Sequence, residues 1–213
     1  MPLSEETADL IADALEFVYT PWPDKNDKYA LRRQLIDLIG DYLYFAPSHE
    51  VADIHSKVAP VYMYDFEHRR TIGNKNKEWM GVVHGDNVPY ELGIPFFPGL
   101  SSEFDAGDRN VSSFLMELYV NFAKSGDPTP QPVSGVTWER YNISHRAYLR
   151  VDAHPKMAAV FVPRRMAFWN DYYPKLLQVK FETKDKVTST ANVDVAMAMF
   201  FKVGLVIVFV MLH

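Results

Sequence analysis

The sequence predicts the trailing part of an α/β fold with a mostly parallel sheet. Helical and strand patterns alternate along the chain, and a glycine-flanked histidine loop follows the first predicted strand. The chain has 213 residues, of which 48% are hydrophobic, so it is long enough and apolar enough for one sizeable core. Two predicted strands cannot form a stable sheet. We therefore expect the missing strands to come from residues upstream of Met1, and the chain to be a fragment.

The first part of the chain predicts helices. Residues 4–19 are amphipathic, and Ser4 can cap the helix that they form. A second helix is expected from about Tyr29, with Pro47 ending or kinking it. A short third helix is expected over residues 51–58.

The remainder alternates between strands and helices. Strand formers bounded by turn residues indicate strands, and apolar residues at helical spacing indicate helices. Pro163 suits the first turn of the last helix. The expected elements are a buried strand over residues 61–66, a polar loop over 69–77, a helix through 111–122, a strand over 147–151 and a helix over 163–177.

Composition narrows the classes of partner. The chain has 22 Lys and Arg against 27 Asp and Glu, a net charge of −5, so we expect no nucleic-acid partner. The absence of cysteine excludes disulfides, thiolate metal sites and thiol catalysis. No pair among the seven histidines has the His-Glu-x-x-His spacing, and we expect neither a metal nor a cofactor.

Three segments bear on localisation. Residues 1–6 have no basic and no apolar run, so they are not a signal peptide. Asn110 and Asn142 begin Asn-x-Ser sequons and are glycosylation candidates if the chain is secreted. Residues 179–194 are expected to be a polar linker and residues 195–213 an apolar membrane anchor or anchor signal.

The tail has the layout of a glycosylphosphatidylinositol attachment signal. Small residues at positions 189–192 precede a short spacer and a terminal apolar stretch. The alternatives are a truncated transmembrane helix, a helix buried in a core and a spurious gene end.

His84 is the strongest candidate for chemistry. Gly81 and Gly85 on either side permit an unusual backbone path. The loop follows a predicted strand, where open α/β sheets place active-site residues. A structural role is the expectation for the other six histidines: His49, His55, His68, His145, His154 and His213.

Five blocks in consistent order over about residues 5–178 resemble the type B carboxylesterase and cholinesterase family. They are residues 64–69, 79–85 (Trp-Met-Gly-Val-Val-His-Gly), 93–95, 121–128 and 167–177. The resemblance implies the C-terminal part of an α/β-hydrolase fold, followed by an apolar C-terminal tail. It assigns residues 1–178 to the C-terminal portion of a carboxylesterase-type domain.

The resemblance implies a carboxylic ester hydrolase in which His84 takes the proton of a serine hydroxyl and returns it to the leaving alcohol. The sequence has no Gly-x-Ser-x-Gly nucleophile elbow. In the family, the nucleophile, the triad acid and the oxyanion glycines lie upstream, and the pattern does not place the acid on Glu67, Asp86 or Glu91. The chain alone is therefore expected to be inactive, and the substrate of the whole protein to be a small ester, with a choline ester as one option.

The chain departs from cholinesterases at several positions. Asp86 replaces a tyrosine, and residues 75–77 are polar where the family has an aromatic; both positions help to wall the choline site, which argues against choline specificity. The family disulfide is missing at Ala46 and Met166. Residues 84–90 also look like the loop of neuroligins, which share the fold, lack that disulfide and are adhesion proteins without esterase activity.

Three readings of function follow. The first is a membrane-tethered, cholinesterase-like serine esterase, and the second is a neuroligin-like, non-catalytic cell-adhesion protein. The third is a truncated gene product without a function of its own. The resemblance also implies a homodimer through a four-helix bundle of residues 5–18 and 163–177, although these apolar faces would equally suit a core. It implies a protein that is secreted or held at the extracellular face of the plasma membrane.

Overall fold

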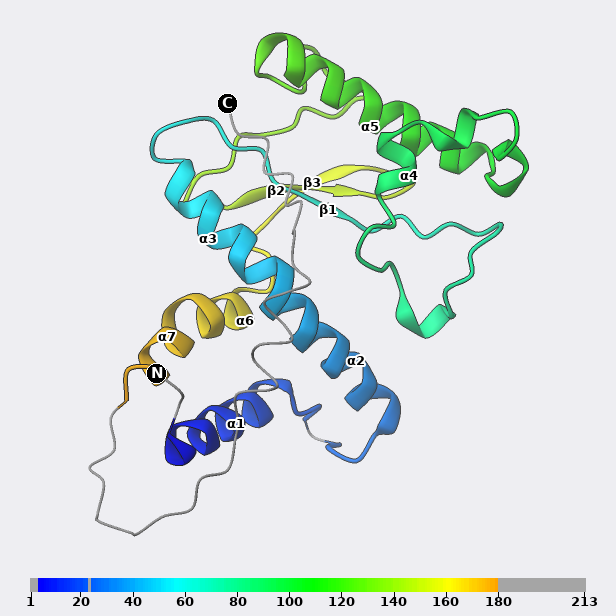
Figure 1. The fold of residues 1–213 in the computed structure, drawn as a ribbon. Coiled ribbons are helices and arrows are strands. Elements are labelled where there is room, and N and C mark those ends of the chain that lie inside the picture. Colours follow the sequence, from blue (N-terminus) through cyan, green and yellow to red (C-terminus); the bar gives the residue numbers. More distant parts are fainter. Residues whose placement is uncertain (1–3, 23, 180–213) are drawn as a thin grey trace. The chain divides into compact units, whose positions relative to one another are not determined.

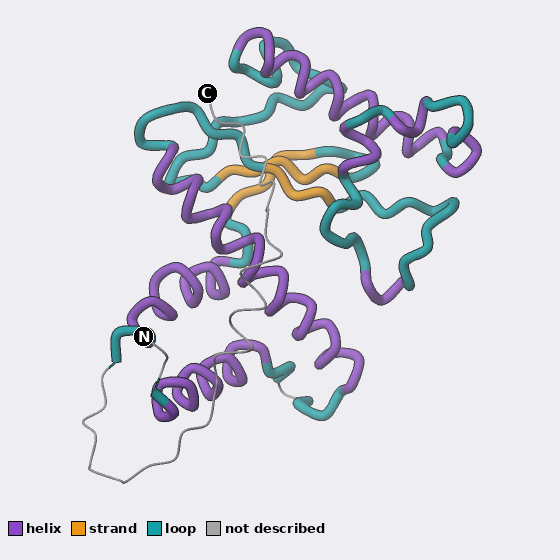
Figure 2. The backbone as a smooth tube through the Cα atoms, in the orientation of Figure 1, coloured by secondary structure: helices purple, strands orange, loops and turns teal. Residues whose placement is uncertain are grey.

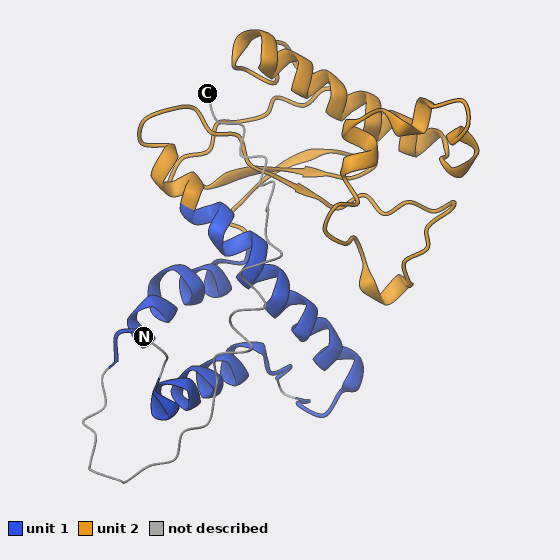
Figure 3. Ribbon diagram, in the orientation of Figure 1, with its two compact units in different colours: residues 1–50, 162–209 blue, residues 51–161, 210–213 orange. Residues whose placement is uncertain are grey.

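The computed structural model describes residues 4–22 and 24–179. They form two compact units (Figure 3), with residues 51–161 in unit 2 and the described residues up to 50 and from 162 in unit 1. Apart from Val179, the expected linker and tail lie outside the described residues. Within the described ranges, no helix has the length and the apolar character needed to cross a membrane.

Unit 1 is helical (Figures 1 and 2). Helix α1 (Glu5–Tyr19) begins at Ser4, whose hydroxyl oxygen accepts the Thr7 amide hydrogen at 3.1 Å, so the predicted cap is confirmed. Helix α2 (Lys28–Gly40) continues through a π-helical turn, η1 (Asp41–Phe45), into α3 (Ala46–His55), whose residues from 51 onward belong to unit 2.

Two of these helices differ from the expectation. Pro47 does not end the second helix but lies in the first turn of α3, directly after η1. Proline has no amide hydrogen for the helical ladder, and it is accommodated where the backbone register changes. The third helix therefore begins five residues earlier than residues 51–58 suggested.

The last helix of unit 1 has three consecutive segments. They are α6 (Pro163–Ala167), the π-helical turn η5 (Phe168–Tyr172) and α7 (Tyr173–Leu176). Together they match the helix predicted over residues 163–177, and Pro163 occupies the first turn as expected. Ala46 and Met166, the two positions at which the family resemblance implies a disulfide in other members, are both buried in unit 1.

A buried ionic network joins the helices of unit 1. The carboxylate of Asp41 is fully buried, and its Oδ2 accepts the Tyr19 hydroxyl at 2.6 Å and lies 2.7 Å from Arg165 Nε. The Trp169 indole donates to the Tyr19 oxygen at 2.7 Å, and Arg165 also donates to Asp37 at 2.7 Å. Burial, followed by the bond to Asp41, raises the pKa of Tyr19, so its phenol stays a donor. The network fixes the packing of α1, η1, α6 and η5.

Unit 2 contains a three-stranded sheet of order β1-β2-β3. Strand β1 (Tyr64–Phe66) pairs in parallel with β2 (Ala147–Val151), and β2 pairs antiparallel with β3 (Lys156–Ala159). Strand β2 has the predicted bounds. Strand β3 was not predicted, because its residues are poor strand formers, and its antiparallel pairing makes the sheet of the described residues mixed.

Strand β1 is shorter than the predicted strand over residues 61–66. The Val61 carbonyl accepts the Tyr141 amide hydrogen at 2.7 Å, and the Met63 carbonyl accepts both the Leu149 amide hydrogen at 2.8 Å and the Trp138 indole hydrogen at 3.0 Å. The segment is buried as expected, but its carbonyl groups bind loop and side-chain donors as well as the neighbouring strand.

The core of unit 2 lies between the sheet and helix α5 (Ala106–Ser125), which runs along one face of the sheet (Figure 1). Leu149 and Val151 of β2 and Leu118 of α5 have no exposed surface. The buried cluster consists of Tyr62, Tyr90, Phe104, Val111, Phe114, Leu115, Leu118, Val133, Trp138, Leu149 and Val151. Since Tyr90 belongs to this cluster, the segment that follows His84 is anchored in the core.

Candidate functional site

His84 lies in the middle of a tight turn. The Asp86 amide donates to the Val83 carbonyl at 3.0 Å, which closes a four-residue turn with His84 and Gly85 at its centre. Gly81 and Gly85 have φ angles of +66° and +91°, which side chains with a Cβ rarely adopt. The unusual backbone path expected from the two glycines is confirmed. His84 itself is exposed.

The Asp86 side chain closes the same turn from its other end. Its Oδ2 accepts the Val83 amide hydrogen at 2.9 Å, and its Oδ1 lies 3.5 Å from Asn76 Nδ2. Asp86 thus bonds to Val83 twice: its backbone amide donates to the Val83 carbonyl, and its carboxylate accepts from the Val83 amide. The Asp86 carboxylate therefore stabilises the conformation of the His84 turn.

A short helix, α4 (Val88–Glu91), follows the turn without a gap. The Val88 amide donates to the Gly85 carbonyl at 3.1 Å, and the Leu92 amide donates to the Val88 carbonyl at 3.1 Å. The His84 turn and α4 are thus one continuous hydrogen-bonded segment, residues 83–92. Contacts that fix the position of α4 therefore also restrain the backbone at His84.

The first anchor of α4 is Tyr90. Its hydroxyl donates to Asp108 Oδ1 at 2.8 Å, and its carbonyl accepts the Ser112 hydroxyl at 2.6 Å. Asp108 is 1% exposed and also bonds to His68 Nε2 at 2.7 Å. Burial, and then the bond to Asp108, raises the pKa of Tyr90. His68 and Tyr90 thus share Asp108 as a hydrogen-bond partner.

The second anchor is Glu91, whose Oε1 accepts three hydrogen bonds. The donors are the Tyr64 hydroxyl at 2.8 Å, the Asn87 amide at 2.7 Å and the Tyr119 hydroxyl at 2.9 Å. The motif stretches 64–69 and 84–90 include Tyr64 and Asn87 but gave neither residue a role, and Tyr119 lies outside every motif. The helical spacing of Asn87 and Glu91 was the one local signal, because the tyrosines lie 27 and 28 residues away along the chain from Glu91.

The third carboxylate near the site, Glu67, forms a two-pronged ion pair with the Arg150 guanidinium of β2, in which Nε lies 2.8 Å from Oε1. Asp86, Glu91 and Glu67 therefore all have structural partners.

Asp65 is a partly buried carboxylate on β1 beside Glu67. Burial, and then the negative charge of Glu67, raises the pKa of Asp65 from 3.8 to about 7, although Arg150 opposes the shift. The folded state therefore favours the protonated form. The stabilisation is fully present below the unfolded-state pKa and is lost as pH rises through about 7.

Replacing Asp65 by asparagine is expected to flatten the dependence of stability on pH. The wild-type free energy of unfolding should fall between pH 5 and pH 8 by on the order of 1 kcal/mol relative to Asp65→Asn, because a partly exposed carboxylate is screened by solvent. Urea unfolding at the two pH values measures the difference. Parallel pH profiles for the two proteins would contradict this assignment.

The two glycosylation candidates differ in their surroundings. Asn110 is exposed on α5, but Ser112, the third residue of its sequon, is fully buried. Asn142 and Ser144 are both exposed in a turn, where Asn142 Oδ1 accepts the amide hydrogens of Ser144 and His145 at 3.1 and 2.8 Å. The Asn142 sequon is thus the more accessible of the two in the folded unit. Among residues 4–22 and 24–179, no three His, Asp or Glu side chains are grouped so that they could hold a metal ion.

The sequence of this chain matches a family of known proteins and several individual relatives. The model of the carboxylesterase family matches residues 2–169. Human neuroligin-2 is 29% identical over 191 residues, and mouse neuroligin-3 is 30% identical over 191 residues; each match covers 80% of this chain. Acetylcholinesterase of Leptinotarsa decemlineata is 34% identical over 167 residues, or 77% of this chain.

These matches cover 22%, 23% and 25% of the three relatives, so the chain spans about a quarter of their length or less. The family match extends over most of the chain and includes the His84 segment, residues 51–161 of unit 2 and unit 1 as far as residue 169. The chain therefore belongs to the carboxylesterase family, in the type B, cholinesterase-like group whose motifs it carries.

Proposed function

We propose that this chain supplies the catalytic histidine, His84, of a cholinesterase-like serine esterase. The single observation that carries the proposal is the geometry of residues 83–92: an exposed histidine in a turn that is closed twice by Asp86 and anchored through α4. An exposed imidazole on a rigid support is what a general base needs in order to meet a nucleophile from another segment.

In this proposal, His84 accepts the proton of a serine hydroxyl as the hydroxyl attacks the ester carbonyl. It then donates that proton to the leaving alcohol, and repeats both steps with water to release the acid. The nucleophile, the triad acid and the oxyanion hole come from residues outside these 213. The chain by itself is accordingly inactive. The polar Asp86 and residues 75–77 support a small ester substrate other than a choline ester.

A direct test compares this chain with the longest product that carries it, hereafter the parent protein. The parent protein should hydrolyse p-nitrophenyl acetate faster than acetylthiocholine, and the isolated chain should hydrolyse neither above background. A parent protein that hydrolyses no ester would favour the alternative, a neuroligin-like adhesion protein. The similarity to neuroligin-2 and neuroligin-3 and the Asp86–Tyr90 stretch support that alternative.

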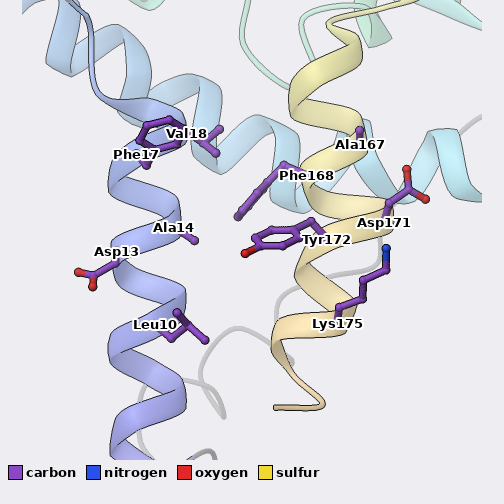
Figure 4. Close-up of a pocket in the computed structure, with 10 residues that line it drawn as sticks. All are labelled: Leu10, Asp13, Ala14, Phe17, Val18, Ala167, Phe168, Asp171, Tyr172 and Lys175. Atoms are coloured by element: carbon purple, nitrogen blue, oxygen red, sulfur yellow. The ribbon is translucent and has the colours of Figure 1, made fainter.

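We also propose a homodimer that uses α1 and the last helix of unit 1. A groove of about 680 Å³ lies between these helices. Figure 4 shows the Phe168 and Tyr172 rings projecting from η5 toward Leu10 and Ala14 of α1. Phe17 at the end of the groove is 65% exposed. Large exposed rings beside an apolar groove suit the four-helix bundle that the family resemblance implies.

Replacing Phe17 by glutamate is expected to dissociate this dimer. A charge at a buried apolar contact should weaken association by about 30-fold or more, which corresponds to at least about 2 kcal/mol. Phe97→Glu in unit 2, where Phe97 is 58% exposed, is the matched control and should leave the dimer intact. Sedimentation of the parent protein measures the mass. A monomeric wild type, or a dimer unaffected by Phe17→Glu, would rule the interface out.

The sequence of the tail supports a further proposal, that the protein is secreted or held at the outer face of the plasma membrane. Residues 1–178 would be the esterase-type portion, 179–194 a linker and 195–213 the anchor segment or signal. Asn142 and Asn110 would carry N-linked glycans. Release of the parent protein from cells by a phosphatidylinositol-specific phospholipase would support a lipid anchor, whereas retention after this treatment would favour a transmembrane tail.

A further inference from the structure

We propose that Glu91 is a positioning residue for His84, and that the side chains of Tyr64, Asn87 and Tyr119 hold it in place. The inference rests on the proposed function in one respect, that His84 is the proton-transfer group. Tyr64 lies in one of the family blocks and Asn87 in the neuroligin-like stretch, whereas Glu91 and Tyr119 lie outside both, and the motifs assign none of the four a role towards His84. The members of the cluster come from β1, the start of α4 and α5.

The geometry makes Glu91 Oε1 the shared acceptor of the cluster. Asn87 has two amide hydrogens, and its Nδ2 lies 2.7 Å from Glu91 Oε1 and 3.1 Å from the Tyr64 hydroxyl oxygen. Tyr119 has one hydroxyl hydrogen, and its oxygen lies closer to Glu91, at 2.9 Å, than to Tyr64, at 3.2 Å. With the Tyr64 hydroxyl at 2.8 Å, all three neighbours can donate to one carboxylate oxygen.

The two tyrosines of the cluster act as hydrogen-bond donors to Glu91. Burial, and then the charge of Glu91, raises the pKa of Tyr64, and burial and the neighbouring Tyr64 and Glu91 raise the pKa of Tyr119. Both phenols therefore keep their hydrogens at any pH at which esters are hydrolysed enzymatically. Hydrogen bonds from neutral donors to an ionised carboxylate are stronger than bonds between neutral groups.

The cluster connects to His84 through the backbone. Asn87 lies three residues after His84, and Glu91 is the last residue of α4. Segment 83–92 is therefore held to β1 by Tyr64 and to α5 by Tyr119, at a point separate from the Tyr90 anchor on Asp108. Two separate attachments fix both the position and the rotation of a one-turn helix. Without Glu91, α4 can rotate about Tyr90 and carry the His84 turn with it.

The experiment uses Glu91→Leu and Glu91→Gln in the parent protein, with Glu117→Leu and Glu117→Gln as controls on the exposed face of α5. Glu91→Leu should lower kcat for p-nitrophenyl acetate by about 10- to 100-fold and change KM by less than about 3-fold, because a displaced base slows proton transfer and leaves substrate binding intact. Glu91→Gln keeps an acceptor oxygen and should restore kcat to within about 5-fold of wild type. Both Glu117 variants should match wild type.

Amide hydrogen exchange gives a readout that does not depend on catalysis. Residues 83–92 should exchange faster in Glu91→Leu and at the wild-type rate in the Glu117 variants, with the remainder of unit 2 unchanged. If Glu91→Leu fails to fold, Tyr119→Phe replaces it, since it removes one donor and retains the ring. Its kcat should fall by about 3- to 10-fold, with the same local change in exchange.

The outcomes separate this inference from the proposed function. If the parent protein hydrolyses no ester, the proposed function fails, and hydrogen exchange alone decides whether Glu91 holds the His84 segment. Wild-type kcat together with wild-type exchange in Glu91→Leu would overturn the inference. Faster exchange throughout unit 2, with Glu91→Gln as impaired as Glu91→Leu, would also overturn it, because Glu91 would then serve the fold as a whole.

Discussion

Replacing His84 by alanine in the parent protein is expected to lower kcat for ester hydrolysis by about 10⁴-fold or more. Without the imidazole, the serine hydroxyl has no base to take its proton, and the leaving alcohol has no acid to protonate it. The residual rate should come from substrate binding and the oxyanion hole. The rate of p-nitrophenol release, corrected for spontaneous hydrolysis, measures the loss.

His145→Ala is the matched control for this experiment. His145 is also exposed and also lies in a turn; its imidazole is 59% exposed and pairs with Glu139, outside segment 83–92. It should keep the wild-type rate to within about two-fold, as expected for exposed surface substitutions. If His84→Ala retains more than about 1% of the wild-type kcat, His84 is not the proton-transfer group.

The second large effect is expected for stability in unit 1. Replacing Asp41 by alanine removes the carboxylate that binds the Tyr19 hydroxyl and lies 2.7 Å from Arg165 Nε. It leaves a guanidinium that is only 21% exposed next to an empty site. Breaking such a buried pair from one side costs about 3–5 kcal/mol, and we expect the free energy of unfolding to fall by about 3 kcal/mol.

Urea unfolding of the parent protein measures this change through its midpoint and slope. The control is Asp171→Ala, which removes an exposed carboxylate from η5 in the same unit and should shift the free energy by less than about 0.5 kcal/mol. A loss below about 1 kcal/mol for Asp41→Ala would mean that the ionic network does not hold the helices of unit 1 together.

Local chemistry explains which elements could be predicted. Ser4 indicated where a helix starts, the strand formers of residues 147–151 indicated β2, and the glycines beside His84 indicated its turn. In each case the deciding residues are neighbours in the sequence. The final helix was predictable for the same reason, because Pro163 and the apolar spacing that follows it are local signals.

The features that could not be predicted depend on distant residues. Strand β3 forms because its backbone pairs with β2, although its side chains favour no strand. The Glu91 cluster brings together Tyr64 and Tyr119, which are 55 residues apart, and it exists only once α5 has packed on the sheet. Sequence spacing identified Glu91 as a carboxylate near the site but gave no indication of its partners.

The central claim is that His84 activates a serine nucleophile supplied by the rest of the protein. Covalent labelling of the parent protein with a fluorophosphonate, followed by mass spectrometry, tests it most directly, because this reagent reacts with an activated serine and requires no knowledge of the natural ester. We expect about one fluorophosphonate label per chain in the wild type and almost none in His84→Ala. A wild type that takes up no label, or equal labelling of wild type and His84→Ala, would contradict it.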